Sequence, residues 1–204
     1  MRRLRRALEV ARGEGLRSFW FKALGELGYR RVVVMECPLD EAEISVTTRI
    51  PVVVGQLGDG DVDEYVRFRP ETDPADIRRR LRDGHRCFVA RHEGHIVHAC
   101  WAATGRAWID YLGRELVLAP DAVYHYDSLT MPAFRGHNIS AFRVREAARH
   151  FRASGYRRLV AVVVPENHAA FRPLEKAGYR SVGTMGYIGL GRWRCHFRRG
   201  QRGP

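Results

Sequence analysis

Hydrophobic residues recur at two different spacings in the first part of the chain, and each spacing predicts a different element. In residues 15–28 apolar side chains return near helical spacing, which predicts an amphipathic helix. The run YRRVVVMECPL, residues 29–39, has the pattern of a strand that Pro38 ends. A second β run, IPVVVGQL, begins at Ile50 and opens the main domain. We therefore expect residues 1–48 to form an N-terminal extension that packs beside that domain.

Helix and strand patterns alternate through the rest of the chain. Two short helices are predicted at 61–68 and 73–84, the second with Asp73 as its N-cap. A hairpin that turns at Glu93-Gly94 follows them. The later predicted elements are an irregular strand pair (107–118), a strand (122–131), a helix with Ser140, Val144, Ala147, Ala148 and Phe151 on one face, a buried strand (157–164), a short helix (166–178) and two C-terminal strands. This order contains one strand–helix–strand crossover, so it predicts an α/β (α+β) fold with helices on both faces of a mixed sheet.

Length and composition fit one domain of ordinary size plus an extension. The chain has 204 residues, and no apolar run is long enough for a transmembrane helix. Charge and glycine interrupt the basic N-terminus before the core of a signal peptide forms, so we expect a cytoplasmic protein. The four cysteines show neither a CxxC motif nor paired spacing, and we expect reduced thiols.

The formal net charge of +12 would by itself favour nucleic-acid binding. Only Lys22 and Lys176 of the 35 basic residues are lysines, however, so the arginines reflect a compositional bias that is spread along the chain. No RNA- or DNA-binding signature accompanies them. We therefore expect an attraction for small polyanionic ligands rather than a nucleic-acid partner.

The stretch TMPAFRGHNISAFRVREAARHF, residues 130–151, combines a strand end, a glycine turn and the start of a helix. Gly136 lets the backbone approach a ligand closely. The amides from His137 to Ser140 are the unpaired N–H groups of a first helical turn, at the positive end of the helix dipole. Arg135 adds a cation whose fork geometry suits phosphate. These residues favour a phosphate site, although many helix N-termini bind nothing.

A second motif follows the predicted strand at 157–164. It reads N-x-x-A-x-x-x-L-x-K-x-G-Y from Asn167 to Tyr179. Together the turn and this motif resemble the GNAT superfamily of acyl-CoA-dependent N-acyltransferases, over the part of the chain from residue 50 to residue 190. In that family the turn is written Q/R-x-x-G-x-G/A and the second motif N-x-x-S/A-x-x-x-Y-x-K/R-x-G-F/Y. The resemblance implies a mixed, mostly antiparallel central sheet flanked by helices on both faces.

This sequence departs from the family pattern at three positions. In the turn, Asn138 stands where a glycine is usual and Ser140 where the last small residue is usual. Asparagine is the next best residue for unusual backbone angles, and serine is still small. In the second motif Leu174 replaces a tyrosine that often acts as the acid in the family. The domain that carries the resemblance is expected to span residues 49–200, with a tail at 201–204.

The resemblance implies that the ligand is acetyl-CoA, which serves as the acyl donor. Its pyrophosphate would lie on the amides of the turn, and its pantetheine arm would pair with backbone groups at the end of the preceding strand. Asn167 would hold the arm or the thioester end, or would cap the helix instead. The residues implied in binding are Leu129, Thr130, Met131, Arg135, Gly136, His137, Asn138, Ile139, Ser140, Asn167, Phe171 and Lys176.

The implied reaction is direct attack of a primary amine on the thioester in a ternary complex. An alkyl amine has a pKa of about 10.4, so a base must take its proton, whereas a thiol with a pKa near 8.5 leaves without strong need of an acid. Asp127 is the candidate base, directly or through water, and His125 is the second. By strand alternation these two would share one face of the sheet. The alternative is that Asp127 pairs with an arginine and holds the sheet. Tyr126 is either a pocket wall or a proton donor to the thiolate.

His92, His95 and His98 look like metal ligands on paper. A hairpin that turns at Glu93-Gly94 would place His92 opposite His95 and direct His98 to the other face, so three ligands would not converge and no metal is expected. The acceptor stays open among a small amine, an amino sugar, an amino acid and a peptide. A rival interpretation is a non-catalytic acyl-CoA-binding module that regulates a partner, and a homodimer is a further hypothesis.

Overall fold

The computed structural model describes residues 28–39, 45–190 and 193–200. The helix expected at 15–28 falls almost wholly outside these residues, and so does the tail at 201–204. The strands are β1 (Tyr29–Pro38), β2 (Val53–Gln56), β3 (Arg86–His92), β4 (His95–Thr104), β5 (Arg106–Ile109), β6 (Arg114–Val117), β7 (Ala122–Thr130), β8 (Arg158–Val163), β9 (Arg180–Leu190) and β10 (Trp193–Gly200). The helices are α3 (Val62–Phe68), α4 (Pro74–Arg82), α5 (Ile139–Ala153) and α6 (His168–Lys176), with short 3-10 turns η1 (Asp59–Asp61) and η2 (Pro132–Phe134).

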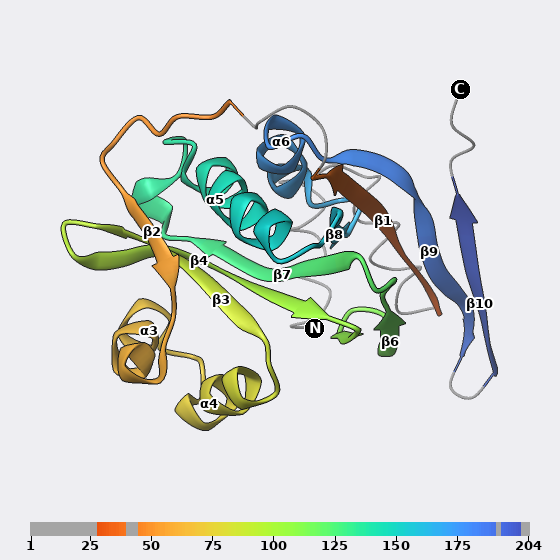
Figure 1. Cartoon of the computed structure of the whole chain (residues 1–204). Coiled ribbons are helices and arrows are strands. Elements are labelled where there is room, and N and C mark those ends of the chain that lie inside the picture. Colours follow the sequence, from red (N-terminus) through yellow and green to blue (C-terminus); the bar gives the residue numbers. More distant parts are fainter. Residues whose placement is uncertain (1–27, 40–44, 191–192, 201–204) are drawn as a thin grey trace, which may run out of the picture.

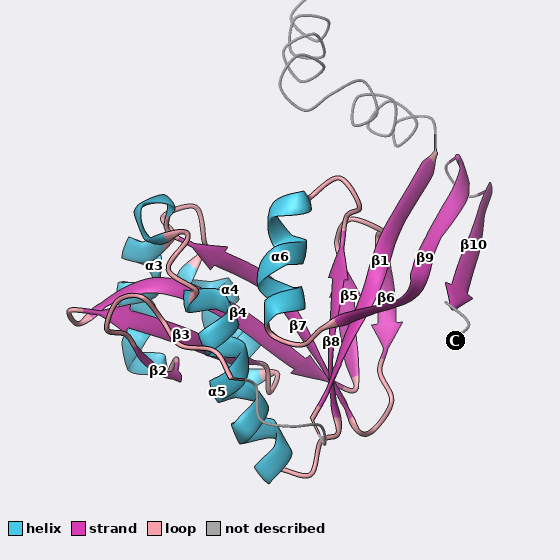
Figure 2. Ribbon diagram, turned by 90° about the horizontal axis from the view of Figure 1, so that it is seen from above, coloured by secondary structure: helices cyan, strands magenta, loops and turns pink. Residues whose placement is uncertain are grey.

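Eight of the strands form one sheet in the order β10-β9-β1-β8-β7-β4-β3-β2, and β5 and β6 form a separate hairpin. Within the large sheet β7 and β8 run parallel, and the other neighbouring pairs are antiparallel. Helices α3 and α4 lie on one face and α5 and α6 on the other (Figure 1, Figure 2). The predicted fold class is therefore confirmed: the sheet is mixed, mostly antiparallel and covered on both faces.

The strand expected at residues 29–39 is present as β1, and it lies inside the sheet. Its residue Val33 pairs with Val163 of β8 on one side and with Thr184 of β9 on the other. Because both edges of β1 are hydrogen-bonded, this strand joins β9 and β10 to the rest of the sheet instead of packing beside the domain. The division of the chain at residue 48 stays a prediction.

Local sequence signals explain where several elements begin and turn. The Asp73 carboxylate accepts a hydrogen bond from the Ala75 amide at 2.8 Å, so it caps α4 as expected. The hairpin of β3 and β4 turns at Glu93 and Gly94, which both have positive φ, 50° and 81°. A two-residue turn of this kind matches the twist of antiparallel strands. The hairpin and the capped helix are thus placed by local sequence.

Helix α5 packs an apolar face against the sheet, with Val144, Ala147 and Phe151 in the core beside Leu159. Ser140, which we expected on this face, is only half-buried. Arg143 lies on the buried side instead, with 1% of its surface exposed. A fully buried arginine needs hydrogen-bond partners, because leaving a charge unsatisfied in the interior is costly.

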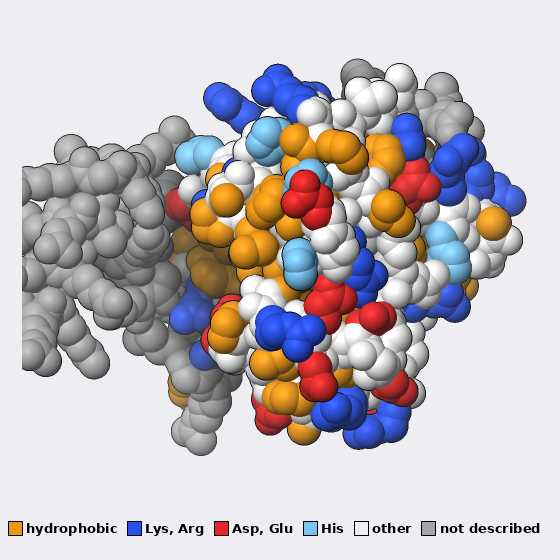
Figure 3. Space-filling model, turned by 90° about the vertical axis from the view of Figure 1, so that its left-hand side faces the viewer, with side chains coloured by type: hydrophobic (Ala, Val, Ile, Leu, Met, Phe, Trp, Pro, Cys, Tyr) orange, Lys and Arg blue, Asp and Glu red, His pale blue; other side chains and the backbone are white. Residues whose placement is uncertain are grey.

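On the side shown in Figure 3, Lys and Arg side chains lie among acidic and apolar ones and do not merge into one continuous patch. This distribution agrees with a compositional origin of the arginines. Within the described part of the chain, none of the helices is both long and apolar enough to cross a bilayer.

Candidate functional site

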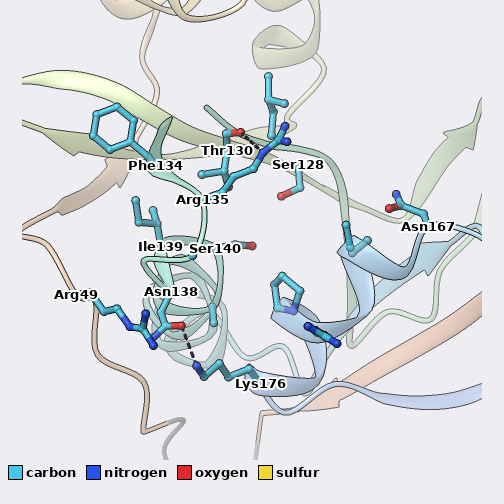
Figure 4. Close-up of a pocket in the computed structure, with 17 residues that line it drawn as sticks. Arg49, Ser128, Thr130, Phe134, Arg135, Asn138, Ile139, Ser140, Asn167 and Lys176 are labelled. Carbon is cyan, nitrogen blue, oxygen red and sulfur yellow. Dashed lines mark hydrogen bonds between the residues drawn. The ribbon is translucent and has the colours of Figure 1, made fainter. Parts of the chain in front are cut away.

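A cleft of about 750 Å³ opens where β7 and β8 part. Their parallel pairing ends at His125 and Ala161, so the edge of β7 that faces β8 is free beyond this point. The N-terminus of α5 and the first turns of α6 form the other walls (Figure 4). The residues that line the cleft are Arg49, Ser128, Leu129, Thr130, Phe134, Arg135, Gly136, Asn138, Ile139, Ser140, Ala141, Asn167, Ala169, Ala170, Arg172, Pro173 and Lys176.

The turn before α5 keeps its backbone amides open to the cleft. Gly136 and Asn138 both have positive φ, 84° and 63°, so asparagine takes the left-handed conformation that glycine would take. The Asn138 side chain does not cap the helix. Its Oδ1 accepts from Lys176 Nζ at 2.8 Å, and its Nδ2 donates to the Thr47 carbonyl at 3.3 Å. First-turn amides have no intrahelical partner, so they remain available to an anion.

Cations surround this turn. Arg135 donates through Nε to the Thr130 carbonyl at 3.3 Å. This hydrogen bond holds the guanidinium at the rim of the cleft, next to the turn. Lys176 reaches the cleft from α6, and Arg49 reaches it from the segment before β2 (Figure 4). Arg172 of α6 also lines the cleft. Arg49 was missed in the sequence because it lies in an irregular segment with no motif. Its amide donates to the His137 carbonyl at 3.1 Å, a contact that only the folded chain shows.

Nine of the twelve residues predicted to bind the donor line the cleft, and Met131, His137 and Phe171 do not. The Met131 amide donates to the Val97 carbonyl at 3.0 Å, and its side chain packs against core residues. Phe171 packs against the core under α6. Asn167 makes no side-chain cap on α6, so its amide group is left to face the cleft.

Asp127 lies at an irregularity of β7, where the register with β4 shifts opposite Cys100. Its φ of 51° breaks the alternation of side chains, so it does not share a face with His125 as we expected. The carboxylate is held by Arg69 of the α3 end and by Arg80 of α4, the latter at 2.8 Å. Burial raises the pKa of Asp127, but the hydrogen bonds from the two arginines outweigh it and bring the pKa below its ordinary value. Both carboxylate oxygens are occupied, as in the structural alternative for this residue.

His125 is buried on the α5 side, away from the cleft. Its Nδ1 lies 3.1 Å from Arg143 Nη1 and 2.8 Å from the Tyr179 hydroxyl. Burial and the charge of Arg143 hold the pKa of His125 well below its ordinary value. The expectation that His125 acts as a base is corrected, because a base has to reach its substrate and this imidazole is enclosed by the core.

Tyr126 faces the other side of the sheet, where the Arg80 guanidinium lies 5.7 Å from its ring centre. Its hydroxyl shares a hydrogen bond with His85 Nδ1. Burial raises the pKa of Tyr126 above its ordinary value. Burial also lowers the pKa of His85, although Asp83 acts in the opposite direction. His85 was missed in the sequence, since a single histidine after the glycine that ends α4 carries no distinguishing signal.

Leu174 and the three histidines of the hairpin were also singled out in the sequence. Leu174, at the position where the family often has tyrosine, packs against the core. His92 pairs with His95 across the hairpin, whereas His98 is buried against Thr130, with Nδ1 2.8 Å from Oγ1. Over the described ranges no three or more His, Cys, Asp or Glu side chains are arranged to hold a metal ion.

Comparison with known proteins places this architecture in a family. The model of the Acetyltransferase (GNAT) family matches residues 57–179. A putative GNAT acetyltransferase from Novosphingobium aromaticivorans has 19% identity and a TM-score of 0.54, over 76% of this chain and 61% of that one. The aminoglycoside N-acetyltransferase AAC(6')-Iy, solved in complex with CoA, has 17% identity and a TM-score of 0.54, over 70% of this chain and 100% of that one. A GNAT-family acetyltransferase from Colwellia psychrerythraea has 12% identity and a TM-score of 0.55, over 89% and 61%. No curated protein matches.

The solved structures share the fold at these identities, and the chain spans less than two thirds of the first of them. The family match is stronger evidence of membership than these structures, because it covers over half of the chain. It includes the turn at Gly136, the motif from Asn167 to Tyr179 and the free edge of β7. The sheet, the cleft and the match agree, and the chain belongs to the GNAT acetyltransferase family.

Proposed function

We propose that this protein is an N-acetyltransferase that moves an acetyl group from acetyl-CoA to a primary amine by direct attack in a ternary complex. The observation that supports this proposal is the cleft, in which open helix amides adjoin a strand edge that lacks a partner. Such a site suits a ligand with a phosphate group at one end and an amide-containing arm at the other. The similar aminoglycoside acetyltransferase was solved in complex with CoA.

Different residues of the cleft would bind different parts of the donor. The amides of the α5 turn and Arg135 would bind the pyrophosphate, and the backbone of Leu129 and Thr130 would pair with the pantetheine arm. Asn167 would hold the arm near the thioester. Arg49 and Lys176 lie near the turn and would attract the phosphate group of the donor that is not part of the pyrophosphate. The acceptor would then approach from the face of α3 and α4, and a small amine, an amino sugar, an amino acid or a peptide would each fit this scheme.

Proton transfer needs a group other than Asp127. Because two arginines occupy its oxygens, Asp127 is a weak base, and we assign it a positioning role for Arg69 and Arg80. Tyr126 and His85 would take the proton instead. The amine attacks the thioester carbonyl and loses a proton to the Tyr126 oxygen, whose own proton passes to His85 Nδ1. The C–S bond then breaks, and the thiol leaves as thiolate without strong need of an acid, which fits the absence of tyrosine at Leu174.

Thermal unfolding in the presence of acetyl-CoA tests the donor. A ligand at about 100 times its Kd adds about 2.7 kcal/mol of stability, which is a rise in Tm of roughly 5–10 °C for a chain of this length. Free CoA should give a comparable rise, since most of the predicted contacts are to its phosphates and arm. A protein that melts cooperatively but shows no rise with either compound would contradict the proposed donor.

Substitution of Tyr126 by phenylalanine tests the proton route. We expect Y126F and H85Q to lower kcat about 100-fold or more while the Kd for acetyl-CoA stays unchanged. The matched control is Y124F, because Tyr124 lies on the same face with its ring stacked on Tyr126 at 5.6 Å. That control should keep kcat near wild type. If D127N, assayed where it is folded, loses kcat while Y126F retains it, Asp127 is the base after all.

The same route predicts a pH profile. The pKa of His85 lies below its ordinary value of 6.5, so the imidazole is neutral and ready to accept a proton at neutral pH. Activity should fall only as the pH drops through this lowered pKa, and the acid limb of kcat/KM should lie below pH 6.5. In H85Q this limb should disappear. A limb of unchanged position in H85Q would assign it to another group.

A non-catalytic acyl-CoA-binding module is the second candidate. The engaged carboxylate of Asp127 and the apolar Leu174 favour it, since both are positions where an enzyme of this family would carry chemistry. This candidate predicts that acetyl-CoA raises the Tm but that no amine in a broad screen yields free thiol. Release of thiol with any acceptor, lost in Y126F, decides for the enzyme.

A further inference from the structure

A chain of buried polar groups runs from the interior of the domain to the wall of the cleft. Arg143 is almost fully buried, with Nε 3.4 Å from His98 Nε2 and Nη1 3.1 Å from His125 Nδ1. His98 is completely buried, and its Nδ1 lies 2.8 Å from Thr130 Oγ1. Of the carboxylates in the described ranges, none lies within ion-pair distance of Arg143. Its buried side-chain partners are therefore the two imidazoles.

The guanidinium fixes the direction of every hydrogen bond in this chain. Arginine only donates, so the nitrogen that faces it on each imidazole has to be the acceptor. For His98 that nitrogen is Nε2, and the ring hydrogen is therefore on Nδ1. For His125 it is Nδ1, and the hydrogen is on Nε2. Burial and the neighbouring guanidinium hold the pKa of both rings well below the ordinary value, so both are neutral at physiological pH.

The tautomer of His98 determines the hydrogen bonding of Thr130, which lines the cleft. His98 and Thr130 stand opposite each other on β4 and β7, so their side chains share one face of the sheet. Because His98 donates through Nδ1, Thr130 Oγ1 is the acceptor of that bond, and its own hydrogen is left for another partner. In the described part of the protein, His98 is the side chain that hydrogen-bonds this hydroxyl.

We propose that Arg143 is a positioning residue that acts through His98, so that the Thr130 hydroxyl is held as a hydrogen-bond donor to an acceptor oxygen of the ligand in the cleft. On the proposed function, on which this identification of the ligand rests, the acceptor is a carbonyl oxygen of the pantetheine arm. Thr130 is thereby a binding residue through its side chain as well as its backbone. The sequence marked Thr130 only for its backbone and did not mark Arg143 or His98 for binding.

The first test uses the free protein labelled with ¹⁵N-histidine. Long-range ¹H–¹⁵N correlation spectra distinguish the two neutral tautomers, and H98Q and H125Q variants assign the signals. We expect His98 as the Nδ1–H tautomer and His125 as the Nε2–H tautomer. Neither ring should titrate in wild type between pH 6 and 8, about one unit on either side of neutrality. In R143M the His98 ring should change its tautomer or begin to titrate. An Nε2–H tautomer of His98 in wild type overturns the proposal.

The second test is a double-mutant cycle on the Kd for CoA, measured by calorimetry. We expect T130V to weaken binding about 3- to 10-fold and T130S to keep it, because serine retains the hydroxyl. R143M should weaken binding in the wild-type background and less so in T130V, since its effect passes through that hydroxyl. If R143M changes the Kd for CoA by the same factor in wild type and in T130V, the proposal is overturned. The lost charge of Arg143 affects both backgrounds equally and therefore does not alter this comparison. If R143M does not fold, T130V and T130S together with the spectra decide.

The two tests separate this inference from the proposed function. If wild-type protein binds no CoA, the proposed donor fails, whereas the tautomers still show whether Thr130 is held as a donor. If CoA binds and T130V binds it as tightly as wild type, the donor stands and the role of Thr130 falls.

Discussion

Replacing Gly136 by alanine is expected to weaken CoA binding about 10- to 100-fold, the cost of losing one or two charge-assisted hydrogen bonds to phosphate. Gly136 has a φ of 84°, and a Cβ built on it meets no atom within 4 Å. The methyl group would therefore point into open space of the free protein, at the turn where the pyrophosphate would approach the backbone. Backbone strain at positive φ would add a loss of about 1 kcal/mol in stability. Calorimetry with CoA and chemical denaturation separate the two effects.

The matched control is Gly155→Ala at the opposite end of the same helix. Gly155 follows α5 and has a φ of 86°, and a Cβ at this position would likewise meet no atom within 4 Å. The strain is thus the same, but the site is remote from the cleft. We expect equal losses of stability in the two variants and an unchanged Kd for CoA in G155A. Equal loss of CoA affinity in both would show that the turn acts through helix stability and not through contact with the ligand.

Replacing Asp127 by asparagine is expected to lower the free energy of unfolding by about 2 kcal/mol at pH 7, between the values for exposed and for fully buried ion pairs. The Asp127, Arg69 and Arg80 side chains are each about one quarter exposed, at 25%, 24% and 23%. Removing the carboxylate leaves two largely buried guanidinium groups without their shared counter-ion. Denaturation with urea, monitored by circular dichroism, measures the loss.

The pH dependence of this difference has a definite sign. The folded pKa of Asp127 lies below its ordinary value, so the carboxylate stabilises the fold fully above that ordinary value. The difference between wild type and D127N should persist from pH 7 down to pH 5 and shrink below about pH 4. The control is E71Q, because Glu71 pairs with the same Arg69 but is 67% exposed, so its removal should lower the free energy of unfolding much less than D127N does. A D127N variant as stable as E71Q would contradict a structural role for this carboxylate.

Local signals in the sequence predicted nine of the residues that line the cleft. The turn at Gly136, the cation at Arg135 and the motif that begins at Asn167 are each written in a few adjacent residues, and the first turn of a helix dictates their geometry. The departure at Asn138 was also interpretable, because asparagine is the residue that best replaces glycine at positive φ. Residues of this kind are predictable since their role depends on the backbone next to them.

The residues that were misplaced depend on contacts between distant segments. Asp127 and His125 were assigned to one face by alternation, which a single residue of positive φ at Asp127 breaks. Arg143 was expected on no particular face, because its burial depends on two histidines from β4 and β7. Arg49 lies at the cleft in the folded chain, where its backbone amide donates to the His137 carbonyl. No local pattern in a single sequence encodes such pairings.

The place of β1 in the sheet also sets the order in which the sheet can be completed. Val33 is synthesised well before its partners Val163 and Thr184, which lie much later in the chain. Strands β2, β3, β4 and β7 pair among themselves and can assemble first, but β9 and β10 attach to the sheet only through β1. Long-range pairings of this kind form slowly, because the loop entropy is lost before the contacts are gained. A nascent chain that stops before residue 180 therefore holds β1 with one neighbour at most.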